Sequence, residues 1–324
     1  MFMNGHNLDL SVALWLATDD YAHNSEVISV TKLIKTVRQI VLASRVPEEE
    51  RTVDVVNLLA SRMGTAIHDS IEKSWVHSYK KSLAALGYSK QIIESVMINP
   101  SQEDLDNNPD KIPVYTERRT QKDIGGYTLS GEYDFCAEGR VEDFKSTSTY
   151  VYMKGVKDEE YRLQGSMYRW LDPETITQDE MAIQFVFTDW KRSEAARNPD
   201  YPSTPVKAYQ IPLLSYEETE QWIKDKLAQV NAHMDTPEPE LPRCTTKDLW
   251  QDATVYKYYA DPVSATLGKK STKNFTSSQA AHEHMGNKGK GIVIDVPGKV
   301  KACNYCEGFS ACTQKDEYIR AGLL

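Results

Sequence analysis

Two short segments, Gly131-Glu-Tyr-Asp134 and Val141-Glu-Asp-Phe-Lys145, decide how the chain folds. Both are interpreted as β-strands, and a Glu-Gly pair at 138–139 between them is typical of a turn. On a strand, residues two apart face the same side, so Asp143 and Lys145 share a face. A hairpin turn at 138–139 then places the carboxylate of Asp134 across from that of Asp143.

Two carboxylates beside a lysine form a site of hard oxygen ligands for Mg²⁺ or Mn²⁺, with a cation next to it. Hydrolysis of a phosphodiester needs these parts, since a metal ion polarises the phosphate and a lysine can orient the attacking water. Glu142 competes for the acidic position, but it lies on the opposite face of its strand, and we choose Asp143. The alternative is a surface hairpin with a salt bridge across its strands.

The pattern around these segments predicts an α/β fold with helices on both sides of the strands in the sequence. We expect one helix through Leu33 and Val41, a second from about Val53 past Trp75, and a third from Tyr79 to Leu86 that Gly87 ends. Further helices are expected at residues 90–97, 158–170 and, behind a Ser215/Glu218 capping box, up to Met234. Residues 100–111 are expected to form an acidic loop. Strands are expected at residues 114–119, 127–138, 140–146, 181–190 and 206–213.

Two helical segments carry further polar residues that align along one helix face. Gly64, His68 and Glu72 are spaced four residues apart, and so are Gln164 and Tyr168. An imidazole could add a nitrogen ligand to a metal held mainly by carboxylates. Each motif by itself is also compatible with ordinary helix surface.

In this order, the motifs resemble the PD-(D/E)XK nucleases, and in particular the branch that contains the RecB and AddB nuclease domains and the four-cysteine CRISPR-associated exonucleases. That branch shows Gly-x3-His-x3-Glu, then Asp, then Asp/Glu-x-Lys, then Gln-x3-Tyr. The resemblance covers residues 29–190 and implies a restriction-endonuclease-like core, a mixed sheet flanked by helices. It implies a metal ion held by His68, Asp134, Asp143 and the backbone carbonyl of Phe144. It also implies Lys145 as the catalytic lysine, with Gln164 and Tyr168 shaping the site and contacting DNA.

Three of the five cysteines, Cys303, Cys306 and Cys312, lie within ten residues near the end of the sequence, and Cys244 is a fourth candidate. Four thiolates from two places suit a metal or iron–sulfur site. The resemblance implies a four-iron, four-sulfur cluster, and Zn²⁺ is the alternative. The family's fourth cysteine usually precedes the nuclease core, whereas Cys244 follows it. Cys136, the only earlier cysteine, is interpreted as a small buried thiol.

The composition is that of a globular protein: 324 residues with 40% hydrophobic and 26% charged side chains. No apolar run approaches the roughly 18 residues of a membrane span, and we expect no signal peptide and a cytoplasmic location, in the host if a phage encodes the chain. The net charge of −9 disfavours nucleic acid, but seven lysines between Ala265 and Lys301 form a candidate phosphate-facing surface. We expect a nuclease part at residues 1–234, a Pro-rich linker at 235–242 and a cysteine unit at 243–324.

These observations predict a metal-dependent DNA nuclease, an exonuclease that acts on single-stranded or frayed ends in phage replication or recombination. No phosphate-binding Gly-x4-Gly-Lys-Ser/Thr loop is present, so any unwinding must come from a partner such as a helicase. Two alternatives remain. The chain could be a catalytically silent DNA-binding scaffold with the nuclease fold, or a zinc-dependent hydrolase module built on His68 and Glu72.

Overall fold

The computed structural model describes residues 2–18, 27–47 and 50–324. The chain forms two compact units. The first comprises Met1–Lys35 and Thr52–Asn231, and the second comprises Thr36–Arg51 and Ala232–Leu324. The boundaries predicted at residues 234 and 243 stay a prediction. The second unit takes in a segment from the N-terminal part of the sequence, which composition alone does not indicate.

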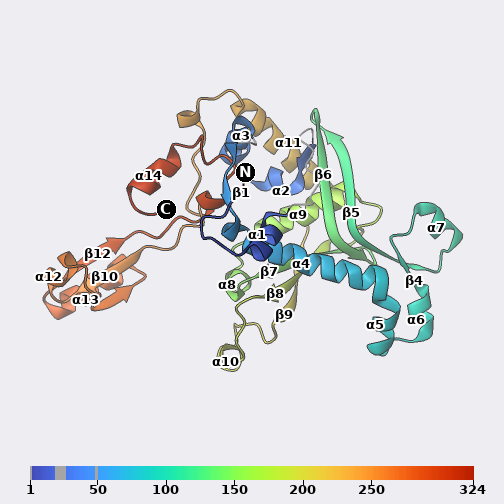
Figure 1. Cartoon of the computed structure of the whole chain (residues 1–324), viewed down its shortest axis with the longest axis horizontal. Helices are drawn as coiled ribbons and strands as arrows, with labels where there is room; N and C mark the ends of the chain where they lie inside the picture. The colour runs from blue at the N-terminus through green and yellow to red at the C-terminus, as the bar shows by residue number, and fades with distance from the viewer. Residues whose placement is uncertain (1, 19–26, 48–49) are drawn as a thin grey trace. The chain divides into compact units, whose positions relative to one another are not determined.

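Within the described residues, the first unit is built on a mixed sheet of seven strands (Figure 1). The strands β5 and β6 form a long antiparallel hairpin, β6 and β7 form a second one, and β8 lies parallel to β7. The strand order is β4-β5-β6-β7-β8-β9, with β2 parallel to β6. Their bounds are β2 Val27–Ser29, β4 Val96–Ile98, β5 Ile112–Ile124, β6 Tyr127–Ala137, β7 Arg140–Thr147, β8 Glu180–Phe187 and β9 Val206–Pro212.

Helices pack on both faces of this sheet. Helix α9 (Asp158–Leu171) buries Leu163, Met167 and Trp170 in the main core, which also contains Cys136 of β6. Helix α4 (Leu59–Lys73) brings Ile71 against Phe135 and Phe144 in a smaller cluster. Since consecutive strand residues face opposite sides, Phe135 and Cys136 show that the two clusters lie on opposite faces. The predicted α/β arrangement, a mixed sheet flanked by helices, is confirmed.

The remaining elements of the first unit are short, apart from α11, whose last residues enter the second unit. Their bounds are β1 Phe2–Met3, α1 Leu10–Ala17, α2 Val30–Ile34, β3 Val53–Asp54, η2 Val55–Leu58, η3 Ser74–Ser78, α5 Tyr79–Ala85, α6 Lys90–Ser95, α7 Gln102–Asn107, α8 Thr149–Lys154, α10 Arg192–Ala195 and α11 Tyr216–His233. No helix among the described residues is long and apolar enough to cross a membrane.

Several of the expected helices differ in the structure. The helix expected through Leu33 and Val41 is wrong, because α2 ends at Ile34 and Thr36 caps a separate helix, α3 (Val37–Arg45). The Thr36 side chain accepts a hydrogen bond from the Gln39 backbone in a capping box, and this holds Thr36 in an extended conformation. The acidic loop at 100–111 contains α7, which Ser101 and Asp104 cap. The predicted capping box of α11 is confirmed by the Ser215 and Glu218 hydrogen bonds.

The second unit combines α3 with the C-terminal residues. A small antiparallel sheet, ordered β11-β10-β12, packs with α13, and the cysteine segment follows. The predicted linker at 235–242 lies within this unit, where Leu241 is buried and Glu238 pairs with Arg38. The elements are α3, η4 Glu238–Glu240, β10 Val255–Tyr259, α12 Pro262–Thr266, β11 Lys273–Phe275, α13 Ser278–Lys288, β12 Ile292–Val296, η5 Ala302–Tyr305 and α14 Gln314–Arg320.

Candidate functional site

The hairpin of β6 and β7 brings Asp134 and Asp143 together as the sequence predicts. Ladder pairing stops at Phe135 and Glu142, and the next residue on each strand is one of the two aspartates. The Phe144 backbone N–H donates to Oδ2 of Asp134 at 2.6 Å, which fixes that carboxylate beside β7. Asp143 is 1% exposed. Two carboxylates therefore meet in a buried site, which is costly unless cations or hydrogen-bond donors compensate them.

Asp143 has two such partners, and both are among the site residues that the resemblance implies. Nζ of Lys145 lies 2.5 Å from Oδ2 of Asp143, and Nε2 of Gln164 on α9 donates to Oδ1 at 3.1 Å. The same Gln164 nitrogen lies 2.7 Å from the Tyr168 hydroxyl, one helical turn further on. Gly131 makes room for Tyr168, because a Cβ there would lie 2.9 Å from its ring. The competing residue Glu142 instead bonds Arg140 and Gln184.

His68 on α4 reaches the same place from the opposite face of the sheet. Its Nε2 lies 2.9 Å from the Phe144 carbonyl oxygen, and its Nδ1 lies 3.5 Å from Oδ1 of Asp134. The imidazole and the carbonyl that the resemblance implies as metal ligands are thus in direct contact. Helix α4 presents His68 here because its Ile71 packs against Phe144 one turn away.

Glu117 joins this site although the sequence analysis did not select it. It lies in β5, where Thr116 and Arg118 pair with β6 on either side, so its position on the strand is opposite Asp134. Its φ of 46° is unusual for a residue with a side chain. The Asn99 side chain bonds both the backbone N–H and the hydroxyl of Thr116, where β5 departs from regular pairing. Counting the same number of residues along β5 and β6 from the turn at 125–126 places Glu117 opposite Asp134.

The electrostatics of the site follow from crowded, desolvated carboxylates. Burial raises the pKa of Asp134 to about 7, and the neighbouring Asp143 adds to the rise. Burial also raises the pKa of Glu117 to about 8, with contributions from Asp134 and Glu132. Burial alone would lower the pKa of Lys145, but the Asp143 and Asp134 carboxylates outweigh it and raise that pKa. The lysine therefore keeps its charge beside the two aspartates, while burial and mutual repulsion oppose ionisation of Asp134 and Glu117, which a further cation would favour.

All of these side chains line one cleft of about 770 Å³. It contains every residue of the first unit that the resemblance implies for the site: His68, Asp134, Asp143, Phe144, Lys145, Gln164 and Tyr168. Five carboxylates face it, from Asp69, Glu117, Glu132, Asp134 and Asp143, against the cations of Arg62 and Lys145. Such a cleft would repel a phosphate backbone unless bound cations reverse its charge.

The donor set fits a divalent metal ion. Among the described residues, one group of three or more His, Cys, Asp or Glu side chains has ligand atoms within 4.8 Å of one another: His68, Glu117 and Asp134. One imidazole with carboxylate oxygens suits Mn²⁺ or Mg²⁺. Asp143 is not in this group, since its oxygens face Lys145 and Gln164. Its role as a ligand stays a prediction.

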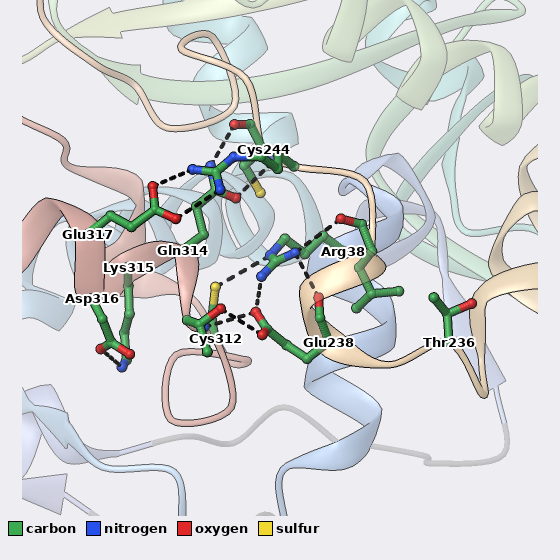
Figure 2. A network of polar contacts seen from close by, with 12 residues as sticks. Arg38, Thr236, Glu238, Cys244, Cys312, Gln314, Lys315, Asp316 and Glu317 are labelled. Atoms are coloured by element: carbon green, nitrogen blue, oxygen red, sulfur yellow. Dashed lines mark hydrogen bonds and ion pairs between the residues drawn. The ribbon is translucent and has the colours of Figure 1, made fainter.

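In the second unit, Cys244, Cys303, Cys306 and Cys312 line one small cavity. Gln314 at the start of α14 holds Cys244 there, since its side chain bonds both the backbone N–H and the carbonyl of Cys244 (Figure 2). Burial raises the pKa of Cys303 to about 11, and the sulfurs of the other three cysteines contribute. No disulfide links the five cysteines, all of which lie in described residues. No three of the four sulfurs lie within 4.8 Å of one another in the part of the chain that the structure describes.

Cys136 has a different environment. It is 1% exposed within the main core of the first unit, and its Sγ lies 3.7 Å from the Thr175 carbonyl oxygen. Its interpretation as a small buried thiol is confirmed.

Neither a protein-family model nor a curated protein matches the sequence. Among solved structures, SSO0001 is similar over 68% of this chain and 85% of its own, with 16% identity and a TM-score of 0.40. A candidate exonuclease from Eubacterium rectale is similar over the same shares, with 14% identity and a TM-score of 0.35. Such TM-scores assign no fold, and the residues of the cleft alone carry the functional inference.

Proposed function

We propose that the chain is a metal-dependent DNA nuclease of the PD-(D/E)XK type, an exonuclease acting on single-stranded or frayed ends. The observation that carries this proposal is the environment of Asp143. A buried carboxylate lies next to a second one, Asp134, and is bonded by Lys145 from its own strand and by Gln164 from α9. A salt bridge on a hairpin surface, the alternative from the sequence, would be exposed to solvent, whereas Asp143 is buried in a large cleft.

The residues that would hold the metal are His68, Asp134, Asp143 and the Phe144 carbonyl, with Glu117 as an additional carboxylate. A bound Mg²⁺ or Mn²⁺ supplies a Lewis acid for the phosphate and lowers the pKa of water. Lys145, charged and fixed by Asp143, is placed to orient a nucleophilic water and to offset negative charge on the phosphate. Gln164 fixes the orientation of Asp143, and the Tyr168 hydroxyl extends the polar wall of the cleft toward the DNA.

The second part of the proposal is a four-thiolate metal site of Cys244, Cys303, Cys306 and Cys312. Four thiols around one cavity are a donor set suited to an iron–sulfur cluster or to Zn²⁺. Tetrahedral zinc with Zn–S bonds of about 2.3 Å would require all four sulfurs within roughly 4 Å of one another. The choice of a four-iron, four-sulfur cluster over Zn²⁺ rests on the resemblance and not on a distance between the sulfurs.

DNA as substrate is supported by a second surface feature. The seven lysines between Ala265 and Lys301 are all exposed, and two of them, Lys299 and Lys301, bond Gly322 and Asp252. Lysines that are exposed in this way can neutralise phosphates without reading sequence. Replication or recombination is the proposed setting, with a separate helicase for any unwinding.

A cleavage assay tests the proposal. Single-stranded DNA labelled at either end, and a circular single strand, are incubated with the protein in Mg²⁺, Mn²⁺, Zn²⁺ or EDTA. We expect stepwise shortening of the linear strand in Mg²⁺ or Mn²⁺ and none in EDTA, with the circle intact. Binding without cleavage in every metal would favour the silent scaffold. Cleavage with Zn²⁺ alone that survives Asp134→Asn would favour the zinc-dependent hydrolase.

A further inference from the structure

Helix α3 and its N-cap residue contribute two hydrogen-bonding side chains to the cysteines, although they precede them by more than 200 residues in the sequence. Nε of Arg38 donates to the Cys312 sulfur at 3.4 Å, and the Thr36 hydroxyl lies 3.6 Å from the Cys244 sulfur. Both partners belong to the second unit. Two of the four sulfurs therefore have polar partners in one short segment.

The Arg38 guanidinium is held in a single orientation. It is 3% exposed, and its Nη1 donates to the carbonyl oxygens of Glu238 and Leu241, each at 3.2 Å. Its Nη2 pairs with the Glu238 carboxylate (Figure 2). The same carboxylate accepts from the backbone N–H and the hydroxyl of Thr313, the residue after Cys312. Glu238 thus fixes both the donor and the segment that carries the sulfur.

Close backbone packing keeps α3 at this place. A Cβ added to Gly308, between Cys306 and Cys312, would lie 2.5 Å from the Leu42 Cβ and 3.2 Å from its carbonyl carbon. The cysteine loop therefore lies directly against α3, and Arg38, Gln39 and Leu42 line the cavity with the cysteines.

This arrangement has a chemical consequence for a metal bound at the sulfurs. A divalent centre held by four thiolates carries a formal excess of negative charge, whether it is zinc or an oxidised four-iron cluster. Hydrogen bonds from a charged donor are among the stronger ones, and those to ligand sulfurs affect both metal affinity and reduction potential. Glu238 already balances the charge of Arg38. Arg38 therefore acts on Cys312 through its directed N–H···S hydrogen bond and not through net charge.

We propose that Arg38 is a positioning residue of the cysteine site, which holds the Cys312 sulfur in place for a bound metal through its N–H···S hydrogen bond, and that Thr36 does the same for Cys244. This inference rests on the proposed four-thiolate metal site. It adds that residues 36–38 belong to that site, so the N-terminal segment completes a centre whose ligands all come from the C-terminal part.

The chain offers a matched control on the same helix. Arg45 lies two turns after Arg38 and donates to the carbonyl oxygens of His233, Met234 and Thr236. Within the described residues, Arg45 makes no hydrogen bond to a sulfur. Arg38→Lys and Arg45→Lys therefore both remove guanidinium–carbonyl bonds from α3, but only the first removes a donor to a ligand sulfur. A merely structural role predicts that the metal release of each variant follows its loss of thermal stability.

The experiment measures how fast the purified, metal-loaded full chain releases its metal to a colorimetric chelator, bathophenanthroline disulfonate for iron or pyridylazo-resorcinol for zinc. We expect Arg38→Lys to release metal roughly 10- to 100-fold faster than wild type, and Arg45→Lys to match wild type. For an iron–sulfur centre, Arg38→Lys should also lower the reduction potential, because the lost donor stabilised the more negative reduced state. Thr36→Val should release metal faster than Thr36→Ser, which keeps the hydroxyl and the helix cap.

Equal release from Arg38→Lys and Arg45→Lys would overturn the inference while leaving the metal site in place. Wild-type protein without metal would overturn the metal site and this inference together. If Arg38→Lys does not fold, the comparison of Thr36→Val with Thr36→Ser decides the inference, since only the first loses the hydroxyl beside the Cys244 sulfur. Metal release from Thr36→Val at the rate of Thr36→Ser would then reject the role of residues 36–38.

Discussion

The acidic cleft and the cysteine site, which we propose as two metal sites, are assembled in opposite ways. In the cleft, Glu117, Asp134 and Asp143 come from three consecutive strands, and strand pairing with two tight turns sets their spacing. At the cysteine site, the residues of the small sheet and α13 separate Cys244 from the other three cysteines in the sequence. Side-chain hydrogen bonds from Gln314, Thr36 and Arg38 hold the Cys244 and Cys312 segments in place.

This difference predicts different consequences of losing the metal. A site on a paired sheet is preorganised, and the fold does not depend on its ligands. A site that closes a long loop contributes its binding energy to folding. We therefore expect ligand substitutions in the cleft to remove activity and leave the fold intact, and ligand substitutions among the cysteines to destabilise the second unit.

The largest expected effect is that of Asp143→Asn on cleavage. The variant removes a buried charge next to Asp134 and the partner of Lys145, so we expect a loss of order 10²-fold or more in the metal-dependent rate, with wild-type thermal stability or higher. Loss of the Asp143 charge relieves the repulsion on Asp134. Cleavage rates on labelled DNA and circular dichroism melting check the two parts.

Glu142→Gln is the matched control for this substitution. It neutralises the neighbouring carboxylate on the opposite face of β7, which bonds Arg140 and Gln184. Near wild-type cleavage by Asp143→Asn, or loss of cleavage only in Glu142→Gln, would move the acidic position by one residue.

The second prediction concerns the fourth cysteine. Cys244→Ser should lose the bound metal and unfold the second unit at lower temperature, because a structural metal contributes directly to folding. Cys136→Ser should keep the metal, since its thiol lies in the core of the first unit. Metal analysis and the visible spectrum distinguish the two. A brown protein that absorbs near about 400 nm is expected for an iron–sulfur centre.

A colourless wild type with one zinc per chain would reject the iron–sulfur assignment and keep the four ligands. Retention of metal by Cys244→Ser, together with its loss from Cys136→Ser, would show that the wrong cysteine had been chosen.

The two sites also differ in how far the sequence predicts them. Asp134, Asp143 and Lys145 follow from strand alternation and one hairpin turn, which are local rules. Glu117 was missed although the same counting from the turn at 125–126 reaches it, because a lone Glu in a strand reads as an exposed position. Arg38 could not have been found, since its role depends on packing across about 200 residues, and the capping box at Thr36 that breaks the expected helix was not recognised.

The third prediction tests the nitrogen ligand of the cleft. His68→Ala should weaken metal binding and raise the Mg²⁺ concentration needed for half-maximal cleavage, because Nε2 lies at the Phe144 carbonyl and Nδ1 faces Asp134. Mn²⁺ should restore more of the activity than Mg²⁺, since a softer ion depends less on an ideal set of oxygen ligands. Metal titrations of the cleavage rate measure this. An unchanged titration would leave His68 a structural residue that only bonds Phe144.

The smallest expected effect is on the pH dependence of stability, and it tests Glu117. In metal-free protein, the pKa of Glu117 is about 8 and that of Asp134 about 7, both above their ordinary values. Between about pH 4 and pH 8 the native state then binds more protons than the unfolded state, so the free energy of unfolding falls as pH rises through this window. A divalent ion offsets the ionised carboxylates, so it should raise the melting temperature more at pH 8 than at pH 6.

Glu117→Gln should flatten this pH slope and reduce the stabilisation by Mn²⁺ at pH 8, each by roughly a few degrees in melting temperature. The neutral amide needs no ionisation and offers the metal a weaker ligand than a carboxylate. Melting curves in EDTA and in Mn²⁺ between pH 5 and pH 8.5 measure both quantities, with Glu142→Gln as the control on the same sheet. A pH slope and a Mn²⁺ effect identical to wild type would remove Glu117 from the metal site and leave its left-handed backbone conformation to a purely structural cause.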